Sequence, residues 1–312
     1  MFRTVPSELR MAGMIVMALL WEGQAYAGDS DEKKPEVIQD CRYDPGNGSE
    51  TNGAFPSDDV FRPLMADPKQ PQFFATVQAL RTRADRTSVN IGSVALGENF
   101  GFYTKRQGCD GWQVSLLTGV FSQFNLDAPS AELINTDFVV GVPVTWRAGN
   151  WSTRVRYSHQ SSHLGDEFLL SRPGFTRLNF SYEEIEAILS YDYKWARFYA
   201  GGGFLTHREP STQDRNKVHW GLELRGPTIA WAPVLTIFDR LRVTPVLAAD
   251  FKTFEELHWI INANVLGGLE WAREGSIRRL RIMVNYYHGF NPYGQFFSQK
   301  VETVGIGFYF MF

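Results

Sequence analysis

The feature that most constrains the fold is an alternation of apolar and polar residues that recurs along most of the chain. It is clearest where Phe138, Val140, Val142, Val144 and Trp146 are separated by single residues. Such a period of two is typical of strands with one apolar and one polar face. Similar runs start near residues 73, 89, 112, 151, 177, 197, 218, 242, 257, 278 and 300. They predict about twelve strands, and no segment shows the stripe of an amphipathic helix.

Composition decides which all-β architecture these strands favour. Aromatic residues make up 14% of the chain, and the mean hydropathy of -0.24 is too polar for a helical membrane protein. A soluble sandwich also contains many alternating strands. Aromatic density and strands of roughly ten residues favour a transmembrane antiparallel β-barrel, whose apolar residues face lipid and whose polar residues face the lumen.

The first 27 residues have the pattern of a secretory signal peptide. Arg3 and Arg10 are basic, residues 11–21 are apolar, and Ala25-Tyr26-Ala27 is an A-x-A cleavage site. The apolar run is too short to cross a bilayer, although a retained anchor helix is an alternative. We therefore predict an exported protein. Since the residue directly after the cleavage site is Gly28 and not cysteine, a lipoprotein is not expected.

The mature chain is predicted to have two parts. Residues 28–70 are rich in Asp, Lys, Gly, Asn and Pro, and they show no sustained periodicity. We interpret them as a periplasmic N-terminal segment that is partly disordered, followed by the barrel at residues 71–312. Cys41 and Cys109 are the only cysteines. In an exported protein they predict one disulfide, with two free thiols as the alternative.

The last strand gives the expected location. Val304, Ile306, Phe308, Phe310 and Phe312 share one face. A terminal aromatic with apolar residues at alternate positions resembles the signal read by the bacterial outer-membrane assembly machinery; a buried strand of a soluble protein is the alternative. We therefore expect the outer membrane of a Gram-negative bacterium, with its lipids as partners and the assembly machinery contacting Phe312. The net charge of -3 gives no reason to expect a nucleic-acid partner.

Connection lengths predict the orientation, because barrels keep short turns on the periplasmic side and longer loops outside. The connections at 148–150, 194–195 and 273–276 are short, and those near 162–176, 207–217 and 288–299 are long. The stretch 226–240 is an unusually long connection on the expected periplasmic side. The histidines then fall near the outer rim, as a site or as ordinary interfacial polarity: His159, His163, His207, His219, His258 and His288.

Several stretches resemble one bacterial family. They read "FRPLMADPKQPQF" (61–73), "GCDGWQVSLLTGVFSQFNLDAPSAELINTDF" (108–138), "SHQSSHLGDEFLL" (158–170) and "GGGFLTHREPS" (201–211). The chain resembles, over roughly residues 60 to 312, the proteins grouped as domain of unknown function 1207, which are predicted outer-membrane proteins. The resemblance implies a fold and a location, with no assigned chemistry.

The strand that starts at Trp151 carries the candidate catalytic residues. Its even positions include Arg154 and Arg156, and arginine at mid-depth is costly on a lipid-facing wall, so the even face is the lumen. His159 and Ser161 then face lipid near the outer leaflet. Residues i and i+2 of a strand share a face at about 6.5–7 Å, close enough for a His–Ser hydrogen bond.

His-x-Ser on the outer wall is similar to the motif of outer-membrane phospholipase A and of lipid A deacylase. In those enzymes the histidine activates a serine two residues later, and a residue of the neighbouring strand orients the imidazole. By that resemblance Asn179 or Glu183 would orient His159. The chain departs from their pattern after the serine, where Ser162-His163 replaces Asn-Gly. A polar hairpin at the rim that contacts headgroups is the alternative.

Two function classes therefore remain open. The first is a barrel of uncharacterised role, structural or a pore or binding protein for a small solute. In it the charged residues predicted to face the lumen would close it by pairing or line a narrow pore: Arg154, Arg156, Glu184, Glu186, Glu223 and Arg225. The alternative is an outer-membrane acyl hydrolase of the phospholipase or lipid A deacylase type. Whether the protein is an enzyme stays undecided at this point.

No cofactor is expected, although calcium is possible for a hydrolase. Asp127, Glu132 and Asp137 surround one predicted outer loop and could bind calcium through their carboxylates. Solvated loop acids are the alternative.

Overall fold

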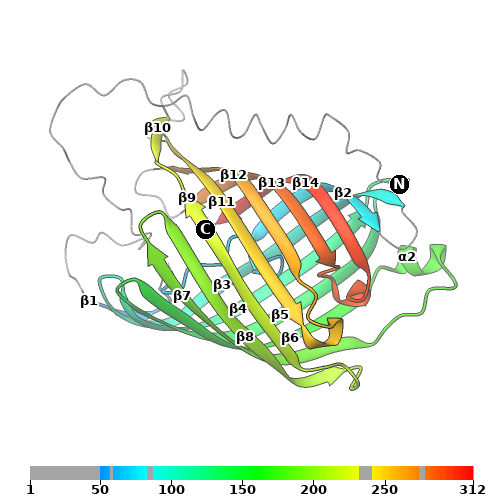
Figure 1. The fold of residues 1–312 in the computed structure, drawn as a ribbon, viewed down its shortest axis with the longest axis horizontal. Coiled ribbons are helices and arrows are strands. Elements are labelled where there is room, and N and C mark those ends of the chain that lie inside the picture. Colours follow the sequence, from blue (N-terminus) through cyan, green and yellow to red (C-terminus); the bar gives the residue numbers. More distant parts are fainter. Residues whose placement is uncertain (1–49, 57–58, 83–86, 232–240, 274–277, 312) are drawn as a thin grey trace. The chain divides into compact units, whose positions relative to one another are not determined.

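Twelve antiparallel strands close into a barrel in the computed structural model, which describes residues 50–56, 59–82, 87–231, 241–273 and 278–311 (Figure 1). The wall strands are β2 (Phe73–Thr82), β3 (Ser88–Gln107), β4 (Asp110–Asn125), β5 (Glu132–Ala148), β6 (Trp151–Leu164), β7 (Phe180–Tyr193), β8 (Ala196–Glu209), β9 (Asn216–Arg225), β11 (Leu241–Phe254), β12 (Asn262–Arg273), β13 (Arg279–Phe290) and β14 (Lys300–Met311). Strand β14 pairs with β2 and strand β3 pairs with both β2 and β4, so the ring has no open edge. The predicted barrel is confirmed.

Short elements complete the described structure. Strand β1 (Glu50–Ala54) pairs with the end of β3, and β10 (Ile229–Trp231) pairs with β11. The loops hold helix α2 (Asp166–Ser171) and the single turns η2 (Glu255–Leu257) and η3 (Gly294–Phe296). No helix within the described residues is long and apolar enough to cross a bilayer. The predicted signal peptide at 1–27, Cys41 and Phe312 lie outside the described residues.

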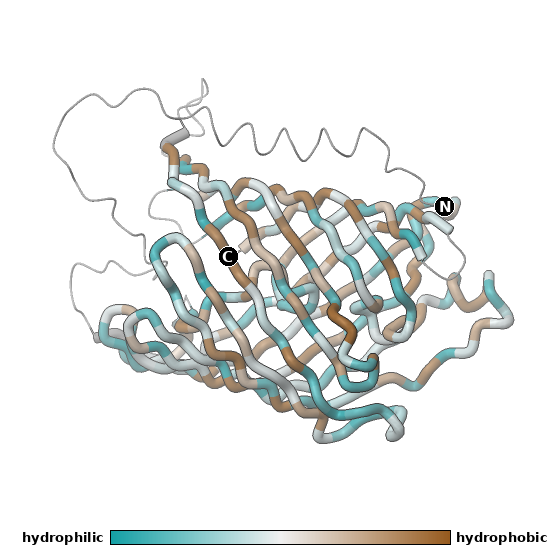
Figure 2. Tube along the Cα trace, viewed as in Figure 1, coloured by the Kyte–Doolittle hydropathy of each residue, from teal (hydrophilic) through white to brown (hydrophobic). Residues whose placement is uncertain are grey.

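The outer face of the wall is apolar. Along β5, Val140, Val142 and Val144 are exposed while the residues between them are buried, and Figure 2 shows apolar residues recurring along the wall strands. Exposed aromatic residues gather near the short turns: Trp112, Trp146, Trp151, Tyr193 and Trp195. An aromatic girdle beside short turns is typical of the periplasmic interface of a barrel.

The inner face is polar and its charges are paired. Arg154 and Arg156 approach Glu186 at 2.9 and 3.0 Å, and Lys217 lies 2.5 Å from Glu184. All five side chains are buried. A buried charge is strongly destabilising when it is unpaired, so this arrangement satisfies the lumen internally. The residues predicted to face the lumen do so.

The lumen also contains a stretch of main chain, residues 59–72, which we call the luminal segment (Figure 1). Leu64 and Ala66 are fully buried within it. The Met65 N–H donates to Glu223 at 2.7 Å, and the Ala66 carbonyl accepts a hydrogen bond of 2.7 Å from Asn264. The sequence predicts a periplasmic segment at residues 28–70, whereas residues 59–70 pack against lumen-facing side chains.

Charged residues anchor the luminal segment at several heights. Arg62 pairs with Asp192, Asp67 pairs with Lys252, and Lys69 Nζ lies 2.6 Å from Asp137 Oδ2. Each partner projects inward from a different wall strand. The segment is therefore held to the wall along its length, inside the lumen.

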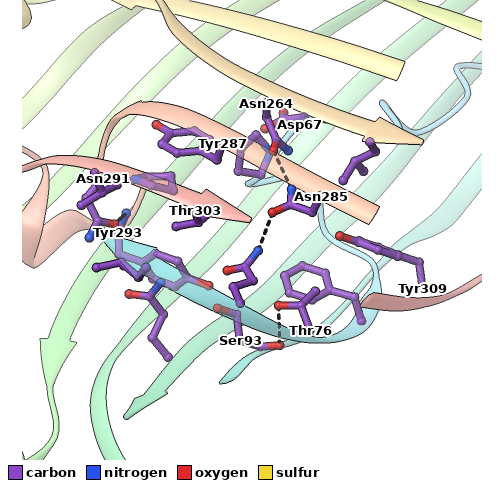
Figure 3. A pocket seen from close by; sticks show the side chains of 18 of the residues that line it. Asp67, Thr76, Ser93, Asn264, Asn285, Tyr287, Asn291, Tyr293, Thr303 and Tyr309 are labelled. Atoms are coloured by element: carbon purple, nitrogen blue, oxygen red, sulfur yellow. Dashed lines mark hydrogen bonds between the residues drawn. The ribbon is translucent and has the colours of Figure 1, made fainter. Parts of the chain in front are cut away.

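Two cavities remain beside the luminal segment. Figure 3 shows one in which Gln78 donates to Asn285 at 2.6 Å and Asn285 donates to Asn264 at 2.7 Å. Asp67 of the luminal segment lines the same cavity. A second, larger cavity lies above Pro68, that is, on its outer-loop side, and encloses about 1210 Å³, including space open to solvent.

Two further predictions concern the last strand and the cysteines. Val304, Ile306, Phe308 and Phe310 of β14 face outward, as the alternation predicts. Cys109, in the turn between β3 and β4, is disulfide-bonded.

Candidate functional site

The candidate site lies on the outer wall where β6 pairs with β7. The register places His159 directly opposite Glu183 and Ser161 opposite Ser181. On β6 the even positions are buried in the lumen and the odd positions face outward. The strand alternation therefore brings these four side chains to the same lipid-facing surface.

His159 and Glu183 form the polar contact at the centre of the site. The Nδ1 atom of His159 lies 3.2 Å from Oε1 of Glu183, and the two side chains are 42% and 27% exposed. A carboxylate at Nδ1 favours the tautomer that carries its proton there and fixes the plane of the ring. The other ring nitrogen, Nε2, is then left as the basic one.

Ser161 lies on the same face as His159, one pair nearer the outer loops. In the described part of the chain its hydroxyl makes no hydrogen bond, including none to His159. A hydroxyl without a hydrogen bond is compatible with a nucleophile, because catalytic hydrogen bonds are often long without substrate and tighten in the complex.

Asn179 does not join the site. It precedes β7, is exposed, and makes no hydrogen bond to His159 within the described residues. Of the two residues predicted to orient the imidazole, the structure therefore brings only Glu183 to His159. Asn179 would face His159 only if the register of β7 against β6 were shifted by four residues.

Apolar side chains surround the polar cluster. Val140 is opposite His159 on β5 and Phe138 is opposite Ser161, and both are nearly half exposed. The ring of Phe138 meets His163 edge-on at 5.8 Å. A lipid acyl chain can therefore lie against this part of the wall with its ester beside the polar pair.

The depth of the site matches an ester of the outer leaflet. His159 and Ser161 lie eight and ten residues beyond Trp151 of the aromatic girdle beside the periplasmic turns. For a strand tilted by about 40° this is roughly 20–25 Å along the membrane normal. That height is close to the outer edge of an apolar band of about 25 Å.

The three acids proposed as calcium ligands have separate partners. Asp127 accepts two hydrogen bonds of 2.8 Å from Asn90, which lower the pKa of its carboxyl below the usual value. Glu132 pairs with Arg172, while Asp137 pairs with Lys69 inside the barrel. The described residues hold no cluster of three or more His, Cys, Asp or Glu side chains suited to a metal ion.

The histidines do not form a single group. His219 points into the lumen, fully buried, with Nε2 2.6 Å from Asp250 and Nδ1 3.4 Å from Glu186. His207 faces outward on β8, opposite Glu183. The candidate site thus includes His159, which contacts Glu183, and His207 on β8, the strand next to the one that carries Glu183.

Comparison with known proteins identifies the family. The model of the family described as protein of unknown function (DUF1207) matches residues 36–312. The chain belongs to this family. No curated protein matches the sequence.

Solved structures with a similar fold are outer-membrane barrels. The Salmonella typhi outer-membrane phospholipase dimer with bound calcium is 10% identical, with a TM-score of 0.52 over 80% of this chain and 94% of that chain. Outer-membrane phospholipase A of Escherichia coli is 11% identical, with a TM-score of 0.50 over 82% and 95%. LpxR from Salmonella typhimurium is 10% identical, with a TM-score of 0.40 over 77% and 100%. The protein is thus an outer-membrane β-barrel.

Proposed function

We propose that the protein is an outer-membrane acyl hydrolase that cleaves lipid esters at the level of the outer leaflet. Ser161 is the nucleophile, His159 is the general base, and Glu183 orients the imidazole. The observation that carries this proposal is the 3.2 Å contact between His159 and Glu183 on the lipid-facing wall, with Ser161 beside it. The fold shared with two outer-membrane phospholipases supports the same substrate class.

The residues account for both halves of the reaction. Nε2 of His159 takes the proton of Ser161 as Oγ bonds to the ester carbonyl carbon. The bond to the leaving alcohol then breaks, and His159 returns the proton to that alcohol. Water, deprotonated by the same imidazole, then attacks the acyl carbon; the bond from that carbon to Ser161 Oγ breaks, His159 returns the proton to Oγ, and the fatty acid leaves. The Glu183 carboxylate stabilises the imidazolium that forms in each half.

The lumen gives less support to an open solute pore. The luminal segment and the ion pairs around Glu186 occupy the path between the two ends. A solute-binding role is the second candidate, favoured by the wide cavity above Pro68. Its lining combines aromatic side chains with amides, as binding pockets for small molecules often do.

A serine-directed probe tests the proposal. We expect a lipophilic fluorophosphonate to label the detergent-solubilised protein at one site, which peptide mass spectrometry assigns to Ser161. Labelling requires an activated hydroxyl, so His159→Ala should abolish it. Ser152 is the internal comparison: its buried hydroxyl on the same strand also makes no hydrogen bond within the described residues, and it should stay unlabelled. Labelling elsewhere, or none, contradicts the assignment of Ser161.

The same probe measures what Glu183 contributes. We expect Glu183→Ala to slow labelling by roughly 10- to 100-fold, because a carboxylate that orients a histidine assists general-base catalysis of that order. Glu183→Gln keeps an acceptor for Nδ1 and should lose less. Equal rates for wild type and Glu183→Ala would mean that the observed contact does not serve Ser161.

A further inference from the structure

The strands that carry the candidate site are tied together from inside the barrel. Pairing between β6 and β7 ends at Ser162 and Phe180, one residue beyond Ser161. A long connection, residues 165–179, follows. The end of a hairpin next to a long loop is where strand pairing opens most easily.

Gln295, in turn η3 between β13 and β14, closes this end. Its side-chain amide donates to the carbonyls of Ser162 at 2.9 Å and of Leu178 at 2.8 Å, and its carbonyl oxygen accepts from the Leu178 N–H at 3.2 Å. The Gln295 N–H donates to Ser162 Oγ at 3.1 Å. One buried glutamine therefore joins β6 to the chain entering β7.

Asp137 of β5 fixes the same point from the other side. Its carboxylate accepts hydrogen bonds from the Ser162 hydroxyl and from the Gly294 N–H, the latter at 3.0 Å. It also receives Lys69 Nζ of the luminal segment at 2.6 Å. Asp137 and Ser162 are almost completely buried, so these bonds are protected from water and hold their partners firmly.

We propose that Asp137, Ser162 and Gln295, which we call the inner clamp, are positioning residues for the site on the opposite face of the wall. Ser162 is the chain neighbour of Ser161, and Leu178 leads into the strand that carries Glu183. The inner clamp therefore sets the distance between Ser161 and the His159–Glu183 pair. Lys69 extends the clamp to the luminal segment, which links the state of the lumen to the lipid-facing site.

This inference rests on the proposed function and makes the positioning of that site its subject. A displacement of about 1 Å can lower a catalytic rate by 10²-fold without touching the reacting groups. The inner clamp does not contact the substrate, because its side chains face the lumen. Its loss should therefore lower kcat and leave KM nearly unchanged.

The test compares Gln295→Ala with Gln78→Ala in an esterase assay on a short-chain ester, with kcat divided by the fraction of protein that fluorophosphonate labels at saturation. Gln78 is the matched control, because it is also a luminal glutamine, but it lies on β2, far from β6 and β7, and donates to Asn285. We expect Gln295→Ala to lower kcat by roughly 10- to 100-fold with KM within twofold, and Gln78→Ala to change neither. Gln295→Glu, which loses both amide donors in nearly the same shape, should resemble Gln295→Ala.

Hydrogen exchange provides a readout that does not depend on activity. The amides of Leu178 and of the β6–β7 tip should exchange faster in Gln295→Ala and at the wild-type rate in Gln78→Ala. Unchanged kcat and unchanged exchange in Gln295→Ala overturn the inner clamp while leaving Ser161 as nucleophile. Faster exchange with unchanged kcat also overturns it, since the clamp would then be structural only. Activity that survives Ser161→Ala overturns the proposed function itself. If Gln295→Ala does not fold, Lys69→Met tests the same cluster through Asp137.

Discussion

Ser161→Ala is expected to lower the rate of ester hydrolysis by at least about a thousandfold, since loss of a serine nucleophile removes the covalent pathway. The measurement is kcat/KM on a phospholipid and on a short-chain ester in mixed micelles, with calcium and with a chelator. Binding of the micelle should not change, because the apolar wall around Val140 and Phe138 is intact. The loss should therefore appear in kcat.

Ser152→Ala is the matched control for this experiment. Ser152 lies on the same strand, but it is buried on the luminal face near the periplasmic turn. We expect it to retain wild-type activity. A wild-type protein that hydrolyses neither substrate, or a Ser161→Ala variant as active as Ser152→Ala, would contradict the hydrolase and leave the solute-binding role as the better account.

Replacing the luminal segment by a flexible linker is expected to turn a barrel that conducts no ions into a conducting one. We propose replacing residues 60–70 by glycine and serine at equal length. This removes the buried side chains of Leu64 and Met65 and the three ion pairs made by Arg62, Asp67 and Lys69. Water then gains a continuous path past the paired wall charges. In a planar bilayer, wild type should show no discrete steps and the variant should show them.

The control replaces the exposed residues 170–174, at the end of α2 and in the loop after it, in the same way, which should leave the barrel without conductance. Heat-modifiable migration on a gel shows whether each variant folds. Should the glycine–serine variant fail to fold, Asp67→Lys serves instead, because it places a like charge beside Lys252. Discrete steps of equal size in wild type and variant would contradict closure of the lumen by this segment.

The outer wall and the orientation of the site follow from sequence for a definite physical reason. Arg154 and Arg156 cannot both face hydrocarbon at low cost, so their strand has only one acceptable orientation. That choice places His159 and Ser161 outside, as observed. The choice between Asn179 and Glu183 depended on the register of β6 and β7, because a shift of four residues exchanges the two opposite His159, and a hairpin with a long loop does not fix that register from sequence.

The luminal segment had no comparable signal. Residues 59–72 are short, contain three prolines and lack a strand period, so they resemble an adaptor between domains. Lys69 and Asp67 are charged, so the sequence alone suggests that they are exposed to solvent. They can be buried only because Asp137 and Lys252, on distant strands, pair with them. Gln295 was missed for the same reason: its role comes from contacts with Ser162 and Leu178, far away in the chain.

The most direct test of the central claim, a lipid-facing site on a closed barrel, is the environment of single nitroxide labels on β6. Ser161→Cys should place the label in lipid, where oxygen relaxes it more than a water-soluble nickel chelate does. Ser158→Cys should show the reverse, because Ser158 lines the water-accessible cavity. Cys109 is disulfide-bonded and does not compete for the label. A label at 161 that responds mainly to nickel, with one at 158 that responds mainly to oxygen, would contradict the assignment of faces and with it the proposed site.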